Sequence, residues 1–117
     1  YVGDDIGAQQ VLHDLVGNGH RLILFTMRSE INYLDDAVAW FKEQDIPLYG
    51  VQSHPEQKSW TASPKAYGEL IIDDTMLGAK LVDGRYLNWQ WTAEALCAQG
   101  LITPAQLAAY DFSLYVF

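Results

Sequence analysis

Arg21-Leu22-Ile23-Leu24-Phe25-Thr26 is the stretch that points most directly to the fold. A short, continuous apolar run that ends in a polar residue is typical of a strand buried on both faces of a parallel sheet. A helical pattern over residues 34–41 follows, and then a second brief strand candidate, Leu48-Tyr49-Gly50-Val51. This order predicts an α/β fold, three-layered and Rossmann-like, with a mainly parallel sheet and right-handed crossovers.

A third apolar run, Leu70-Ile71-Ile72, leads directly into Asp73-Asp74. We expect this run to be a third buried strand, preceded by a loop over residues 52–63 and a short helix over residues 64–70. In parallel sheets the ligand site lies beyond the carboxyl ends of the strands. Thr26 and the two aspartates are therefore expected at the same edge of the sheet, close enough to share one ligand.

The remaining elements complete a single domain over residues 1–117. Residues 1–81 would carry the α/β core, and residues 82–117 the C-terminal helices and a terminal strand. The apolar spacing and the capping residues predict helices at 5–17, 92–99 and 103–110. The terminal strand is predicted at Phe112–Phe117.

A formal net charge of −8 with only seven Lys and Arg argues against a nucleic-acid partner, which needs clustered basic residues. No stretch is long and apolar enough to span a bilayer, and Tyr1–Asp5 lacks the layout of a signal peptide. We therefore expect a cytoplasmic protein without a membrane partner. The oligomeric state stays open, and the aromatic tail is where a homo-oligomer contact would be sought.

Two adjacent carboxylates after an apolar strand repel each other, which raises their pKa values unless a cation neutralises them. Mg²⁺ is the natural partner because it takes oxygen ligands and keeps several waters. Asp73 and Asp74 are therefore candidate metal ligands. The alternative is that they are ordinary turn or cap residues.

Phosphate contacts are predicted in the segment after the first strand. The Thr26 hydroxyl can donate to a phosphate oxygen, and the backbone amides of Met27 and Arg28 open the loop. The Arg28 guanidinium can bind phosphate in bidentate fashion or pair with an aspartate of the next helix. Lys65 can return its ammonium to the same sheet edge, or can be a solvated helix-face lysine.

These segments together resemble the haloacid dehalogenase (HAD) superfamily of phosphohydrolases. Leu22–Thr26 resembles its second motif, Leu70–Asp74 its fourth, and Lys65 stands where the lysine of its third motif belongs. The similarity runs from about residue 3 to residue 81. It is to the small capless members with Thr-Met-Arg after the second strand and Pro-Glu-Gln-Lys-Ser-Trp in the next loop, here Pro55–Trp60.

The resemblance implies Mg²⁺-dependent phosphoryl transfer from a small phosphorylated molecule through an aspartyl-phosphate. In that scheme Thr26 holds a phosphate oxygen and Lys65, with Lys58 as second choice, stabilises charge. Asp73 reaches the metal directly or through water. Asp74 supports the metal shell or bonds to the nucleophile loop.

The family's first motif, Asp-x-Asp-x-Thr after an apolar strand, has no counterpart before the first helix, because no strand precedes Asp4-Asp5. We therefore expect the 117 residues to lack the nucleophile and to be inactive as a phosphatase. The missing central strand would come from an N-terminal extension or, in a permuted arrangement, from Phe112–Phe117.

The alternative function is a catalytically silent HAD-like module that binds a phosphate ligand or a partner protein. The aromatic residues Tyr86, Trp89 and Trp91 favour it as an interaction surface. The alternative role for these aromatic residues is packing inside the protein, since Leu87, Trp89 and Trp91 alternate as in a strand. A response-regulator-like receiver fits less well, because its paired acids follow the first strand.

Overall fold

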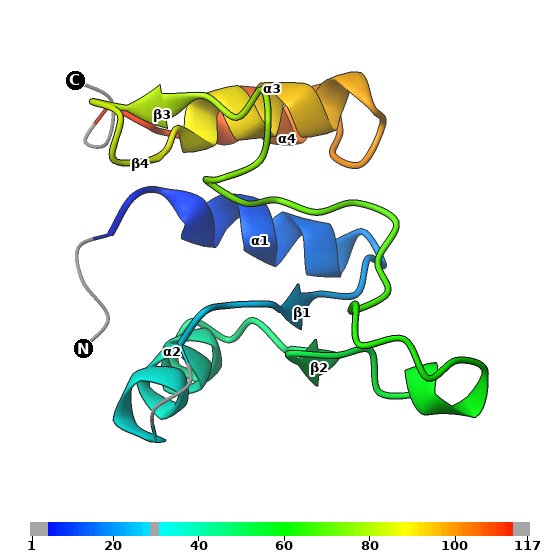
Figure 1. The fold of residues 1–117 in the computed structure, drawn as a ribbon. Coiled ribbons are helices and arrows are strands. Elements are labelled where there is room, and N and C mark those ends of the chain that lie inside the picture. The colour runs from blue at the N-terminus through cyan, green and yellow to red at the C-terminus, as the bar shows by residue number, and fades with distance from the viewer. Residues whose placement is uncertain (1–4, 29–30, 114–117) are drawn as a thin grey trace. The chain divides into compact units, whose positions relative to one another are not determined.

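The computed structural model describes residues 5–28 and 31–113, which divide into two compact units. The first unit contains the described residues between 20 and 71, and the second contains residues 5–19 and 72–113. The described residues form helices and two small sheets, one parallel and one antiparallel (Figure 1). The mixed α/β class is therefore confirmed, and each described sheet has two strands.

The first unit contains the predicted strand, helix and parallel strand. β1 (Ile23–Leu24) pairs in parallel with β2 (Gly50–Val51), and α2 (Ile31–Glu43) connects them. Backbone hydrogen bonds of 2.8 and 2.7 Å on either side of the paired residues continue the ladder. The parallel relation of the first two strands was thus predicted correctly, although both strands are shorter than expected.

The end of α2 explains how the chain turns back toward β2. Asp45 adopts the left-handed conformation with φ of 58°, and the amide of Ile46 donates to the carbonyl of Phe41 over 2.9 Å. This is the hydrogen-bond pattern of a Schellman helix end, which commonly brings an apolar residue back against the helix. Ile46 is accordingly buried.

The expected burial of the first strand on both faces is wrong. Ile23 and Leu24 are half-buried, and Phe25 is 56% exposed. In the described ranges β1 has a single partner strand, β2. A two-stranded sheet cannot cover both faces of a strand as a wide sheet between helix layers does.

The expected third strand at Leu70–Ile72 is also wrong. The three residues are in irregular backbone, and each side chain is more than a third exposed. A strand forms only where a neighbour accepts and donates the backbone hydrogen bonds. Within the part of the chain that the structure describes, no strand pairs with these residues.

The expected helix over residues 64–70 is replaced by irregular backbone. The buried side chain of Gln57 donates to the carbonyl groups of Ser63 and Lys65 and accepts from the amide of Tyr67. A helix would need such carbonyls for its own bonds to residues four positions later. The side-chain amide of Gln57 therefore holds this segment in another conformation.

The second unit is mainly helical and contains most of the buried core. Two of its helices, α3 and α4, pack against each other, and α1 contacts α3 (Figure 1). The buried apolar side chains of this unit are Val11, Leu15, Val82, Leu87, Trp89, Ala93, Leu96, Ile102 and Phe112. Its elements are α1 (Ala8–Gly17), β3 (Leu81–Val82), β4 (Tyr86–Leu87), α3 (Trp89–Ala98) and α4 (Pro104–Ala109).

Local signals at the helix ends explain these bounds. α4 begins with the predicted capping box, in which Thr103 and Gln106 exchange hydrogen bonds, and Pro104 occupies the first turn. α3 begins three residues earlier than predicted because the Asn88 side chain accepts from the amide of Trp91 over 3.0 Å. The strand-like alternation through Trp89 is thus wrong, but Trp89 is buried, as the internal-packing alternative expected.

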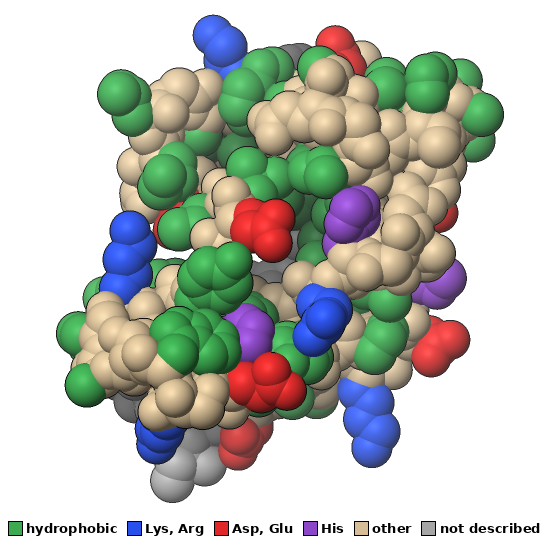
Figure 2. Space-filling view, turned by 90° about the vertical axis from the view of Figure 1, so that its right-hand side faces the viewer, with side chains coloured by type: hydrophobic (Ala, Val, Ile, Leu, Met, Phe, Trp, Pro, Cys, Tyr) green, Lys and Arg blue, Asp and Glu red, His purple; other side chains and the backbone are tan. Residues whose placement is uncertain are grey.

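The predicted terminal strand falls partly outside the described residues. Phe112 and Ser113 are not in a strand, and residues 114–117 lie beyond the described range. In the described ranges, no helix has the length and hydropathy needed to cross a membrane. Several large apolar side chains are exposed at the surface, and hydrophobic groups are accordingly visible in Figure 2.

Candidate functional site

The predicted phosphate segment, Thr26–Arg28, directly follows β1 at its carboxyl end and is held by Gln52, which follows β2. The Thr26 amide donates to Gln52 Oε1 over 2.9 Å, and Gln52 Nε2 donates to the Thr26 carbonyl over 2.8 Å. The same nitrogen lies 3.2 Å from the Arg28 carbonyl oxygen. The side-chain amide of Gln52 therefore continues the parallel ladder by one more step beyond the two strands.

Gln52 adopts a left-handed backbone conformation, with φ of 67°. This conformation is uncommon for residues other than glycine and is found preferentially where the surroundings enforce it, often at functional sites. Three hydrogen bonds of the Gln52 side chain accompany this conformation. The preceding Gly50 is also required, because a Cβ there would lie 2.4 Å from the Ser53 carbonyl oxygen.

The Thr26 hydroxyl is positioned to donate. Its oxygen accepts from the Arg28 amide over 3.2 Å, which uses one lone pair, and among the described residues the hydroxyl donates to none. The Arg28 Nη1 atom donates to the Tyr33 carbonyl over 3.0 Å, in the first turn of α2. The Met27 side chain is 96% exposed, so this segment faces solvent.

Lys65 lies in the segment that Gln57 holds, and its side chain is exposed. The Gln57 side chain bonds to the Lys65 carbonyl, and also to the Ser63 carbonyl and the Tyr67 amide, two residues to either side. The backbone that carries the candidate cation is therefore ordered, whereas the ammonium extends into solvent. Lys58, the second choice, lies in the 3-10 helix η1 (Gln57–Ser59) and is also exposed.

Asp73 and Asp74 form the start of a tight turn in the second unit. Asp73 Oδ1 accepts from the amide and from the hydroxyl of Thr75, both over 3.0 Å, and its carbonyl accepts from the amide of Met76 over 3.3 Å. This is the turn role that the sequence left open beside metal binding. It occupies one oxygen of Asp73.

The pKa values of the two carboxyl groups are shifted in opposite directions. The hydrogen bond from the Thr75 amide, and then the one shared with Asp74, lower the pKa of Asp73. The hydrogen bond shared with Asp73 raises the pKa of Asp74, and burial and the negative charge of Asp73 act in the same direction. The pair thus holds a proton more readily than two separate aspartates would, which is the electrostatic situation that a cation relieves.

These two carboxylates fit the oxygen chemistry of Mg²⁺, which is usually bound through one or two carboxylates, with waters and phosphate oxygens as further ligands. Over residues 5–28 and 31–113, no cluster of three or more His, Cys, Asp or Glu residues has the geometry of a metal site.

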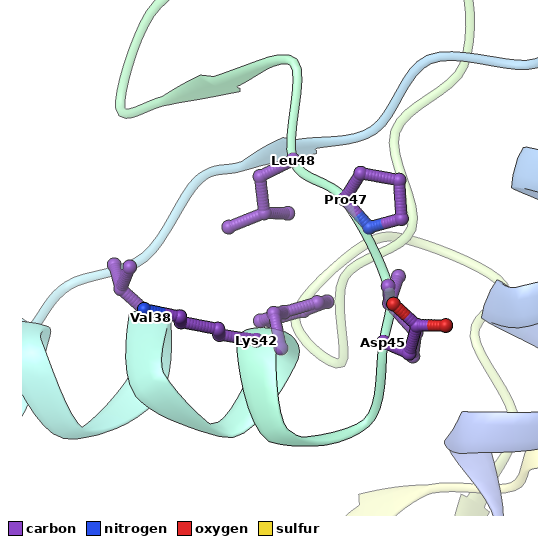
Figure 3. Close-up of a pocket in the computed structure, with 7 residues that line it drawn as sticks. Val38, Lys42, Asp45, Pro47 and Leu48 are labelled. Atoms are coloured by element: carbon purple, nitrogen blue, oxygen red, sulfur yellow. The ribbon is translucent and has the colours of Figure 1, made fainter.

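An apolar hollow of about 280 Å³ lies in the first unit, between the end of α2 and the segment that leads to β2 (Figure 3). Its walls are mostly aliphatic and aromatic, with Lys42 and Asp45 as the charged members. None of the predicted site residues lines it. The lining residues are Val38, Phe41, Lys42, Asp45, Ile46, Pro47 and Leu48.

The residues that organise these segments, Gln52 and Gln57, were not identified from the sequence. Both lie in the predicted loop over residues 52–63, and neither belongs to a periodic pattern. The signal that was available is the length of that loop, since long ordered loops need side chains to satisfy their backbone groups.

No protein-family model, curated protein or solved structure matches the chain.

Proposed function

We propose that this chain is a HAD-like domain that binds a phosphorylated small molecule and Mg²⁺ and belongs to a Mg²⁺-dependent phosphohydrolase with a three-layer Rossmann-like core. The observation that carries the proposal is the Thr26–Arg28 segment at the carboxyl end of β1, held by Gln52 beside a parallel strand. Polar loops at the carboxyl ends of parallel strands are the usual position of phosphate sites in α/β folds.

The chain's own residues divide the work as follows. The Thr26 hydroxyl and the Met27–Arg28 backbone contact phosphate oxygens, and Lys65 offsets the charge of the phosphate group. Asp73 and Asp74 would hold Mg²⁺, whose chemistry is to neutralise the charge of phosphoryl oxygens. The covalent step needs a nucleophilic aspartate after a strand, and we assign that role to no residue of the printed sequence.

Calorimetric titration with inorganic phosphate in the presence of Mg²⁺ tests the proposal. Thr26→Val removes the donating hydroxyl, so we expect phosphate affinity to fall about fivefold to tenfold, the value of roughly one hydrogen bond. Thr61→Val is the matched control, because the Thr61 hydroxyl oxygen likewise accepts from the amide two residues later. Equal affinities for Thr26→Val and Thr61→Val would remove Thr26 from the site.

A second pair of variants separates the two candidate lysines. Lys65→Ala should weaken phosphate binding, and Lys58→Ala should leave it unchanged, because the Gln57 bonds order the backbone at Lys65. The reverse result would move the cation role to Lys58. The silent-module alternative predicts the same binding, and no hydrolysis even where the nucleophile motif is restored.

A further inference from the structure

Four aromatic side chains of the first unit, Tyr49, His54, Trp60 and Tyr67, form one cluster. The His54 ring lies 5.2 Å from Tyr49, 5.1 Å from Trp60 and 5.6 Å from Tyr67, measured between centroids. Trp60 and Tyr67 are 5.9 Å apart with an interplanar angle of 90°. All four contacts have the edge-to-face geometry that aromatic pairs prefer.

Two of these rings remain largely in water. Trp60 is 53% exposed and Tyr67 is 49% exposed. The two rings also contact each other, so their exposed parts are neighbours. A contiguous exposed apolar surface on an ordered loop commonly marks a binding site.

This surface is held rigidly although its backbone is largely irregular. The Gln57 side chain, 6% exposed, fixes the amide of Tyr67, and the backbone carbonyl of Gln57 accepts from the amide of Trp60 over 3.1 Å. The amide of Glu56 donates to His54 Nδ1 over 3.1 Å, which fixes the orientation of that ring. A ligand would therefore meet preorganised rings and would lose little affinity to ordering them.

Basic side chains accompany the cluster in an otherwise acidic chain. The Arg21 guanidinium stacks on Tyr49, 4.7 Å from the ring centroid. Lys58 and Lys65 lie on the same loop as Trp60. From His54 to Lys65 the one acidic residue is Glu56. Arg21 is thus beside these rings, and Lys58 and Lys65 each lie two residues from one of them in the sequence, which favours an aromatic ligand that carries negative charge.

We propose that the aromatic cluster binds the base of a nucleotide, so that the phosphorylated substrate class is a nucleoside monophosphate. The phosphate half of this inference rests on the proposed function above, and the base half rests on the rings. A base stacked on Trp60 lies perpendicular to Tyr67, the relation that the rings of the cluster already have. Stacking of a base on an exposed aromatic ring strengthens binding by about tenfold, whereas a sugar phosphate without a base gains none of this.

Titration calorimetry with adenosine 5′-monophosphate, ribose 5-phosphate and adenosine, each with Mg²⁺, tests the inference. In the unchanged chain the nucleotide should bind about tenfold more tightly than the sugar phosphate. Trp60→Ala should abolish this advantage without changing the affinity for ribose 5-phosphate, and Trp60→Phe should retain most of it. Leu77→Ala, which removes a fully exposed apolar side chain of the second unit, is the control and should behave like the unchanged chain.

The outcomes separate the two proposals. Equal affinities for the nucleotide and the sugar phosphate, or an advantage that survives Trp60→Ala, would overturn the base site and leave the phosphate function intact. Binding of adenosine that depends on Trp60, without binding of either phosphate ester, would support the base site and overturn the phosphate function. Absence of binding by all three compounds would overturn both.

Discussion

At the scale of single residues, Asp73 and Asp74 combine a turn with the proposed metal site. The Thr75 amide and hydroxyl orient Asp73, and the shared hydrogen bond keeps the second carboxyl group within reach of the first. An ordinary surface turn would need Asp73 alone. The raised pKa of Asp74 is the local sign of a pair that favours either a proton or a cation.

Replacing Asp73 by Asn should lower the pKa of Asp74 toward its ordinary value. The change removes the negative charge of Asp73 and weakens the shared hydrogen bond, two of the causes that raise this pKa. Carbon-detected NMR titration of the carboxyl groups measures the shift. Asp111→Asn is the control, and an unchanged Asp74 titration in Asp73→Asn would show that the two groups are independent.

Gln52→Glu tests the ordering of the phosphate segment. The substitution keeps the shape of the side chain but removes both hydrogens that reach the Thr26 and Arg28 carbonyls, and it places negative charge beside those oxygens. We expect a loss of about 1–3 kcal/mol in the free energy of unfolding, measured by urea titration. Gln9→Glu, on the exposed face of α1, should change stability by less than about 0.5 kcal/mol. Similar losses for both variants would mean that the Gln52 bonds contribute nothing specific.

At the scale of elements, the second unit is joined by a hydrogen bond between α1 and the end of α4. The hydroxyl of Tyr110 donates to the Asp14 carboxylate over 2.7 Å. Burial, and then this hydrogen bond, raise the pKa of Tyr110 above its ordinary value of 10.0. Because the folded chain keeps the hydroxyl proton more tightly than the unfolded chain, the stabilisation is complete below pH 10 and is lost as the pH rises beyond it.

Tyr110→Phe should therefore cost about 1–2 kcal/mol of unfolding free energy at neutral pH, the value of a partly exposed hydrogen bond to a charged acceptor. The difference from the unchanged chain should narrow above pH 10, where only the chain with Tyr110 loses stabilisation to ionisation. Urea unfolding at a series of pH values measures this. A difference that stays constant up to pH 11 would contradict the assigned role of the hydroxyl group.

Elements that depend on local signals were predictable, and those that depend on a partner were not. The capping box at Thr103 and the apolar spacing of α1 act within a few residues, so these two helices were located correctly, whereas the helix predicted over residues 64–70 was not. The β3–β4 hairpin was missed although Asp83-Gly84, both with positive φ, is a strong hairpin signal. Leu70–Ile72 has the composition of a strand, but composition does not supply a pairing neighbour.

The candidate site shows the same division. The sequence predicts Thr26 and the aspartate pair as candidate site residues because both follow apolar runs directly. It could not locate the supports of the site, because the contacts of Gln52 with Thr26 and of Gln57 with Tyr67 join residues 26 and 10 positions apart. Such tertiary hydrogen bonds leave no periodic pattern in the chain.

At the scale of the whole molecule, the net charge of −8 opposes the binding of an anion. A phosphate group approaching this chain is repelled overall and is attracted only locally, by groups such as Lys65 and by a bound cation. The proposed function therefore requires that phosphate affinity depend on Mg²⁺. By thermodynamic linkage, phosphate must increase the affinity for Mg²⁺ by the same factor.

The most direct test is the affinity for inorganic phosphate measured by calorimetry with and without Mg²⁺, in the unchanged chain and in Asp73→Asn. Asp111→Asn, which removes one exposed charge elsewhere, controls for the change in net charge. We predict that Mg²⁺ tightens phosphate binding about tenfold in the unchanged chain and in Asp111→Asn, and has no effect in Asp73→Asn. The same phosphate affinity with and without Mg²⁺, or a Mg²⁺ effect that persists in Asp73→Asn, would contradict the account.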